Sequence, residues 1–230
     1  MSVKSNIGVV TDGLVFYVDA GNTKSYPGSG TTWTDLVGSA NGTLTNGPTF
    51  DSANGGSILF DGTDDYSLHS SVSTAWPVTM SCWVKFDTVA STQTQMAQSD
   101  VSASNQFFGI AAGVDAGNFK QRIFNYNGTY SQAVGTTTLT AGTWYYFTGV
   151  FASNTSKRMY LNGVLECELT TSGAIGTGLD TLSISSYQRG GGSPSGAYHD
   201  GNIACGSVYN KALSVAEIEQ NYNALKNRFV

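Results

Sequence analysis

Charged side chains are scarce in this chain of 230 residues: Asp, Glu, Lys and Arg together make up only 12%, about half the usual share. The 11 Lys and Arg residues form no cluster, and the formal net charge is −5. Nucleic-acid binding needs a basic stripe that neutralises phosphates, and anionic membrane surfaces attract the same kind of segment. We therefore expect neither nucleic acid nor membranes among the partners.

Cysteine is also scarce, and long apolar runs are missing. Cys82, Cys167 and Cys205 are far apart and odd in number, which excludes a disulfide framework and the usual spacing of metal ligands. We interpret them as small buried apolar residues. The early apolar run at 14–18 is too short for a signal peptide or a membrane span. We expect a protein made in the cytoplasm and not exported by the general secretory route.

The residues that are present predict an all-β fold. The stretch 78–86 (VTMSCWVKF) alternates between two faces, as a strand requires. Asn162-Gly163 separates two apolar runs and is the preferred pair for a type I′ hairpin, and Asn127-Gly128 is a second candidate. We expect strands at 14–18, 57–60, 66–69, 78–86, 106–111, 119–126, 144–151, 158–161, 164–170, 181–187 and 203–209.

One helix is predicted near the end of the chain, at about 214–226. Ser214 is a good N-cap, and Glu217 three residues later completes a capping box. The apolar residues that follow fall on one helical face, which we expect to pack on the sandwich. Two long irregular stretches, 21–35 and 185–201, are candidate functional loops. No repeat or linker divides the chain, so we expect one domain over residues 1–230.

Five segments, taken in order, resemble a known superfamily. They are GLVFYVDAGN, GSILFDGTDDYSLHSS, VTMSCWVKF, TWYYFTGVF with KRMYLNGVLE, and GNIACGSVYNKALSVAEIEQNYNALKNRF. They resemble laminin-G-like domains of the concanavalin A-like lectin/glucanase superfamily, in particular those of virion structural proteins of tailed bacteriophages. The resemblance implies a concanavalin A-like jelly-roll sandwich of two antiparallel sheets with one short C-terminal helix, in agreement with the strand pattern.

The catalytic signatures of this superfamily are weak in the chain. Its glucanases carry acidic residues at alternate positions of one strand, because retaining hydrolysis needs two carboxylates about 5 Å apart. Glu166 and Glu168 share a face, but a third acidic residue is missing. The two histidines, His69 and His199, accompany no Gly-x-Ser-x-Gly elbow. We expect no catalytic residues, with a polysaccharide-cleaving glycoside hydrolase as the alternative.

Calcium is the other chemistry to consider, because many members of the superfamily bind it through oxygen ligands. The candidate ligands are Asp19, Asp61, Asp64, Asp65 and Asp200, which only the fold can bring together. The family often has an acidic residue where this chain has Ala204. The segment 61–65 (DGTDD) is first of all predicted to be a turn between two strands. No cofactor is required by these patterns, and calcium is the possible one.

Carbohydrate binding needs stacking aromatic rings together with polar hydrogen-bonding groups. Loop residues of these types form the candidate site: Tyr26, Trp33, Tyr126, Tyr130, Tyr187, Arg189, Tyr198 and His199. The alternative for each is that it covers the rim of the core, as aromatic residues at loop ends usually do.

These observations lead to a hypothesis about function. The chain is expected to be a non-catalytic virion surface protein, a capsid decoration, knob or fibre module that binds host or environmental glycans. Its expected partners are other virion proteins, above all the major capsid protein, and further copies of itself, and its expected location is the virion. A stand-alone calcium-dependent lectin is a further alternative to the glycoside hydrolase.

Overall fold

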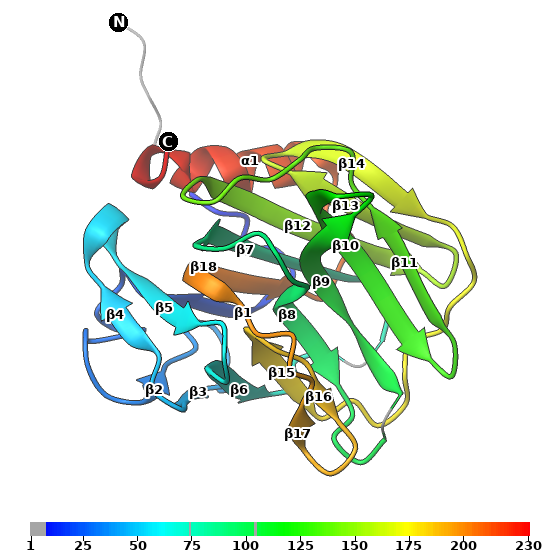
Figure 1. Cartoon of the computed structure of the whole chain (residues 1–230), viewed down its shortest axis with the longest axis horizontal. Coiled ribbons are helices and arrows are strands. Elements are labelled where there is room, and N and C mark those ends of the chain that lie inside the picture. Colours follow the sequence, from blue (N-terminus) through cyan, green and yellow to red (C-terminus); the bar gives the residue numbers. More distant parts are fainter. Residues whose placement is uncertain (1–7, 74, 104) are drawn as a thin grey trace, which may run out of the picture.

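The computed structural model describes residues 8–73, 75–103 and 105–230 and forms two antiparallel sheets that pack face to face (Figure 1). Sheet A contains β1 (Leu14–Asp19), β4 (Thr49–Asp51), β5 (Ser57–Asp61), β7 (Val78–Phe86), β12 (Trp144–Ser153), β13 (Ser156–Leu161), β14 (Val164–Leu169) and β18 (Asp200–Tyr209). Sheet B contains β2 (Thr32–Trp33), β3 (Gly42–Thr45), β6 (Tyr66–Ser70), β8 (Gln93–Ser99), β9 (Gln106–Asp115), β10 (Asn118–Asn127), β11 (Tyr130–Val134) and β15 (Thr181–Ile184).

The remaining elements are short. They are the hairpin of β16 (Gln188–Arg189) and β17 (Ser193–Pro194), the helix α1 (Val215–Leu225), and the 3₁₀ turns η1 (Ala53–Gly55) and η2 (Lys226–Arg228). The two-sheet all-β architecture with one C-terminal helix confirms the predicted fold class. The predicted domain also includes residues 1–7, Thr74 and Ser104, which lie outside the described residues.

The core lies between the two sheets and follows the alternation seen in the sequence. In β7, the side chains of Met80, Cys82, Val84 and Phe86 point into this core and are almost fully buried. They meet apolar residues of sheet B such as Ile110. Burying a large aliphatic or aromatic side chain contributes about 1.5–3 kcal/mol, so this layer is the main source of stability.

The strand predictions are correct where neighbouring residues in the sequence determine the structure, and they are less accurate elsewhere. Strand β7 has the predicted bounds, and Asn162 and Gly163 both have positive φ (52° and 88°) in the predicted hairpin. Strand β15 is shorter than predicted, because Ser185 with φ 72° turns the chain after Ile184.

Strand β8 was not predicted, because its sequence QTQMAQS is too polar to resemble a central strand. All seven of its residues are nevertheless buried. Glutamine side chains make this possible by bonding to backbone groups outside the strand. Gln93 donates from Nε2 to the carbonyl of Thr88 (2.9 Å), and Oε1 of Gln98 accepts from the backbone of Val72 (3.1 Å).

Helix α1 begins at the predicted cap. The Ser214 hydroxyl accepts from the backbone of Glu217, and the Glu217 carboxylate accepts from the backbone of Ser214, so the capping box is confirmed. The helix and η2 lie on the outer face of sheet A (Figure 1), where Tyr222 and Phe229 pack on Trp83. Within the described residues, no helix combines the length and the apolar character needed to cross a membrane.

Candidate functional site

The outer face of sheet B carries a group of aromatic rings, which we call the aromatic face: Phe107, Phe124, Tyr126, Tyr130 and Tyr187. The alternation of side chains along a strand explains why these rings share one face. In β10, Phe124 and Tyr126 point outward, and the alternate residues, such as Ile123, point into the core. The rings lie close together, with centroid distances of 4.4 Å for Phe107–Tyr187 and 5.3 Å for Phe107–Tyr126. Tyr130 is 48% exposed and offers its surface to solvent.

The irregular stretch after β15 forms one wall of this face. The backbone of Thr94 in β8 donates to the carbonyl of Ala197 (2.8 Å), and Ser195 donates to the carbonyl of Tyr187 (3.0 Å). These bonds fix the stretch against sheet B and leave a hollow of about 70 Å³, which we call the aromatic pocket. The residues that line it are Thr92, Thr94, Phe107, Ala111, Arg122, Phe124, Tyr130, Tyr187 and Ala197.

Two arginines belong to this site. Arg122 donates from Nη1 to Oε1 of Gln132 (3.2 Å) and from Nη2 to the carbonyl of Val114 (3.3 Å). Arg189 lies over the Tyr187 ring, with 5.3 Å from the guanidinium carbon to the ring centroid, and donates to the Tyr187 hydroxyl (2.7 Å). Burial raises the pKa of the Tyr130 hydroxyl, and the nearby positive charge of Arg122 lowers it, so the two effects oppose each other.

Four of the predicted carbohydrate-binding residues meet at this site: Tyr126, Tyr130, Tyr187 and Arg189. Arg122, Phe107 and Phe124 also belong to it and were not predicted. Arg122, Phe124 and Tyr126 occupy alternate positions of β10 and therefore share one face of the strand. This spacing was visible in the sequence and could have added Arg122 and Phe124 to the predicted site.

Three other predicted residues are not exposed, which corrects the sequence reading. Trp33 is fully buried and Tyr26 is 3% exposed, because the 21–35 stretch inserts both rings into the core. His199 is fully buried and packs against Phe86 in the core, and burial lowers its pKa to about 4. None of these three rings has a free face on which a sugar could stack.

The last predicted residue, Tyr198, lies elsewhere. It is half-buried and does not belong to the residues that line the aromatic pocket. Burial raises the pKa of its hydroxyl, and the charge of Asp64 and the neighbouring Tyr66 add to this rise. Tyr198 therefore lies on the side of the molecule that carries the aspartates.

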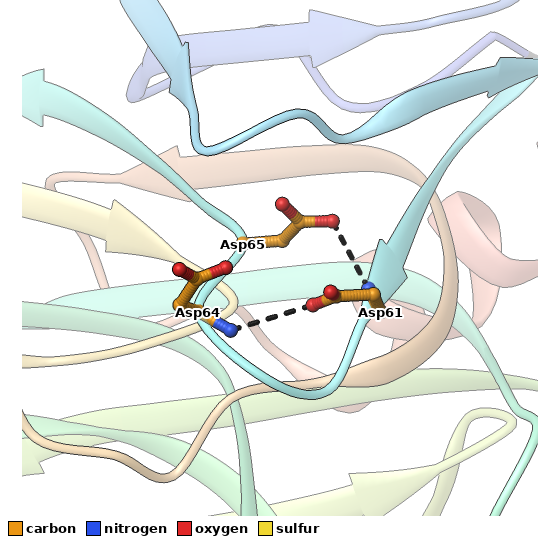
Figure 2. A group of neighbouring side chains, drawn as sticks. All are labelled: Asp61, Asp64 and Asp65. Carbon is orange, nitrogen blue, oxygen red and sulfur yellow. Dashed lines mark hydrogen bonds between the residues drawn. The ribbon is translucent and has the colours of Figure 1, made fainter.

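The aspartates Asp61, Asp64 and Asp65 form a cluster at the turn between β5 and β6 (Figure 2), and each has a carboxylate oxygen within 4.8 Å of the others. The carboxylate of Asp61 accepts from the backbone of Thr63 (2.8 Å) and of Asp64 (3.4 Å). The carboxylate of Asp65 accepts from the backbone of Asp61 (3.1 Å). These bonds confirm that the segment forms a turn.

The aspartate cluster opens into a cleft of about 230 Å³, lined by Asn46, Gly47, Thr49, Leu59, Phe60, Asp61, Asp65, Asp87 and Asp200. Asp65 is 4% exposed, and burial raises the pKa of its carboxyl to about 6. The backbone N–H of Thr63 instead holds the pKa of Asp61 below its usual value. Carboxylate oxygens of this kind are the ligands that calcium prefers.

The predicted calcium set is only partly assembled. Asp61, Asp64 and Asp200 lie at or beside the cleft, but Asp19 does not join them. Both carboxylate oxygens of Asp19 accept from Nη1 of Arg228, at 3.0 and 2.9 Å. The prediction for Asp19 is wrong, because an ion pair with the C-terminal region occupies its oxygens.

The two glutamates of β14 are held by neighbouring groups. Glu166 accepts four hydrogen bonds of 2.7–2.9 Å from the backbone and hydroxyl groups of Thr136 and Thr137. Burial acts to raise the Glu166 pKa, but the four bonds together hold it below its ordinary value. Glu168 pairs with Arg158 at 3.1 Å. Glu166 thus ties the loop that follows β11 of sheet B to β14, and Glu168 ties β13 to β14 within sheet A.

Comparison with known proteins identifies the family. A model of the concanavalin A-like lectin/glucanases superfamily matches residues 60–219, which is more than half of the chain. The chain therefore belongs to this superfamily, and the two-sheet sandwich described above is its fold. No curated protein sequence matches the chain.

Solved structures with similar folds include carbohydrate-active proteins. Domain 4 of AbnA, an extracellular GH43 arabinanase from Geobacillus stearothermophilus, in complex with arabinotriose, has a TM-score of 0.71 at 14% identity, with 91% of this chain and 98% of that domain covered. Trypanosoma rangeli sialidase in complex with sialic acid has a TM-score of 0.70 at 14% identity, with 96% of this chain covered. This chain spans only 34% of the sialidase. At such identities the likeness concerns the fold.

Proposed function

We propose that this protein is a non-catalytic carbohydrate-binding module that binds glycans at the aromatic pocket of sheet B. The observation that carries the proposal is the aromatic face itself: partly exposed tyrosines border a pocket that also contains a guanidinium group. Sugar rings stack on such faces, while fixed polar groups orient their hydroxyls. The fold likeness to a domain solved with arabinotriose supports the same class of function.

The state of the glutamates supports a non-catalytic role. A general acid in a glycosidase needs a raised pKa, whereas four hydrogen bonds lower that of Glu166. Glu168 is engaged in an ion pair with Arg158. The pair that the sequence brought forward as the best hydrolytic candidate is therefore unsuited to acid catalysis.

A glycan array with two matched variants tests the proposal. Tyr187→Ala removes a wall of the aromatic pocket, and Tyr198→Ala removes a half-buried tyrosine on the aspartate side. We expect Tyr187→Ala to abolish binding and Tyr198→Ala to preserve it. The reverse pattern, or the absence of any glycan ligand for the folded wild-type protein, would overturn the proposal.

The virion setting is a separate part of the proposal and rests on the sequence resemblance alone. In it, the module is displayed on a bacteriophage particle as a decoration, knob or fibre domain and contacts the major capsid protein and further copies of itself. Capsid, portal or tail genes next to its gene would support this setting. A neighbourhood of secreted glycoside hydrolases would contradict it.

The aspartate cleft favours a second candidate, a calcium-dependent lectin. Three carboxylates within 4.8 Å of one another next to a cleft of about 230 Å³ are the observation in its favour. Glycan binding that is lost in chelator and restored by calcium, together with a loss in Asp65→Asn, would favour it over the aromatic pocket. The same cleft is also the place to look for hydrolysis, because the pKa of Asp65 is raised and that of Asp61 is lowered, as an acid and a base of a glycosidase require. Turnover of a polysaccharide panel that is lost in Asp65→Asn would mark a glycoside hydrolase.

A further inference from the structure

The two arginines at the aromatic pocket differ from the other two in the chain. Arg158 and Arg228 each form an ion pair with a carboxylate, at 3.1 and 2.9 Å. Arg122 and Arg189 have no carboxylate partner in the part of the chain that the structure describes, and no acidic side chain lines the pocket there. In a chain with a net charge of −5, this pocket is a local excess of positive charge.

The guanidinium of Arg122 has donors to spare. It carries five N–H groups, and two of its nitrogens reach Gln132 and Val114. The residue is only 9% exposed. Its buried Nε nevertheless has no acceptor among the described residues. A buried charged donor without a partner costs free energy, and an anionic ligand group that reaches the guanidinium from the pocket supplies an acceptor for it.

We propose that the aromatic pocket selects acidic saccharides and that Arg122 binds the carboxylate of the sugar. This inference rests on the proposed function, because it names the ligand class of the same site. A hollow of about 70 Å³ holds several water molecules, so it accommodates a carboxylate and one edge of a sugar ring. The rest of the saccharide lies over the exposed Tyr130, with Arg189 at the rim.

The planar guanidinium favours a carboxylate as the anion. Its parallel N–H groups match the two oxygens of a carboxylate, and charge-assisted hydrogen bonds of this kind are about twice as strong as neutral ones. The neighbouring rings exclude water from the pair, which strengthens the interaction further. Hydroxyl groups of Thr92 and Thr94 on the same lining can hold the ring hydroxyls.

The experiment uses the full chain and an array of sialylated, glucuronated and galacturonated glycans, each paired with its neutral or methyl-esterified counterpart. For each pair that binds, calorimetry measures both affinities. We expect the acidic member to bind about tenfold tighter or more, as one charge-assisted bond implies. Equal or tighter binding of the neutral members would overturn this inference and leave the proposed function standing. No binding to any glycan would overturn both.

Variants assign the preference to its residue. In Arg122→Gln the acidic and neutral members should bind alike, whereas Arg158→Gln, which removes an arginine outside the pocket, should keep the preference. If Arg122→Gln does not fold, the exposed Arg189→Gln and a salt titration replace it. The acid preference should shrink in Arg189→Gln and fall as salt screens the charges. A preference unchanged by variant and by salt would contradict the assignment to these arginines.

Discussion

Both outer faces of the sandwich carry an aromatic cluster, and the two clusters differ in how far the rest of the chain covers them. On sheet A, Phe229 stacks on Trp83 with a ring-centroid distance of 4.5 Å, and Trp83 is fully buried. On sheet B, the 185–199 stretch covers Phe107 through Tyr187 but leaves Tyr130 48% exposed. One cluster is completed by the chain itself, and the other keeps a surface for a ligand.

The covering segments explain the difference. Helix α1 and η2 bring a stripe of apolar residues, including Ile218 and Phe229, that closes over sheet A. The stretch over sheet B is rich in Gly and Ser and brings only Tyr187 and Ala197 to the pocket. Arg122 adds a charge that the chain leaves without a carboxylate partner in the described residues. The aromatic cluster of sheet A thus serves stability, and we expect the one of sheet B to serve binding.

The largest expected effect is on the covered cluster. Trp83→Ala removes a fully buried ring that touches Phe229 and Tyr146. It should lower the free energy of unfolding by about 3–5 kcal/mol, as large-to-small core changes do. Urea unfolding followed by circular dichroism measures this. A loss below about 0.5 kcal/mol, the size of an ordinary surface change, would mean that the helix cover adds little.

Tyr187→Ala is the matching change on the open cluster. Its half-buried ring contacts Phe107 and Arg189, so its removal should cost about 1.5–3 kcal/mol, from the aromatic pair and the lost burial together. The stability loss should therefore be smaller than for Trp83→Ala, while glycan binding should disappear. The same urea series and an affinity measurement decide. A loss as large as that of Trp83→Ala would erase the difference between the two faces.

Loosening the cover without removing an aromatic ring should have a smaller effect. Ser214→Ala breaks the capping box of α1 and should cost about 1 kcal/mol of stability. The near-ultraviolet signal of Trp83 should weaken, because a helix that frays from its N-terminus holds Tyr222 and Phe229 less firmly against Trp83. Glycan affinity should stay the same. Weaker binding in this variant would show that the two faces are coupled.

Tyr146→Phe is expected to have the smallest effect on the free energy of unfolding at neutral pH. It should instead change how stability depends on pH. Burial in the covered cluster raises the pKa of Tyr146 far above its usual value. Its contribution to stability is fully present below about pH 10, the pKa of an unfolded tyrosine, and is lost as pH rises toward the folded value. Tyr146→Phe should flatten this alkaline fall, measured by thermal melts from neutral to alkaline pH.

Tyr130→Phe is the control for that titration. Tyr130 also has a pKa raised by burial, but Arg122 opposes the shift and nearly half of the residue is exposed. Its removal should leave most of the alkaline fall in place. If Tyr130→Phe and Tyr146→Phe flattened the alkaline fall in stability equally, the cluster on sheet A would not be less accessible to water than the one on sheet B.

The sequence predicts the fold well wherever the signal is local. The alternation of β7, the Asn162-Gly163 turn and the Ser214 capping box each depend on neighbouring residues, and each is confirmed. Strand β8 was missed because its glutamines are buried in the fold, where Gln93 bonds to the backbone of Thr88 and Gln98 to the backbone of Val72, and the alternation of apolar residues reveals neither bond. The burial of Trp33 likewise depends on the path of a long loop through the core.

The candidate site is predictable only in part. Residue type identified Tyr130 and Tyr187, and strand period could have added Phe124. What the sequence does not contain is the distribution of ion pairs: which arginines meet a carboxylate is decided by the packing of distant strands. The special position of Arg122 therefore became apparent only in three dimensions.

Mapping the bound glycan on the protein by NMR tests the central claim most directly. Amide resonances of the isotope-labelled chain are recorded while the tightest glycan from the array is added. We predict that the shifted resonances belong to β9, β10, β11 and the 185–199 stretch, with Arg122 and Tyr187 among the largest changes. Shifts gathered instead around Asp61, Asp65 and Asp200 would contradict the claim and move the binding site to the aspartate cleft.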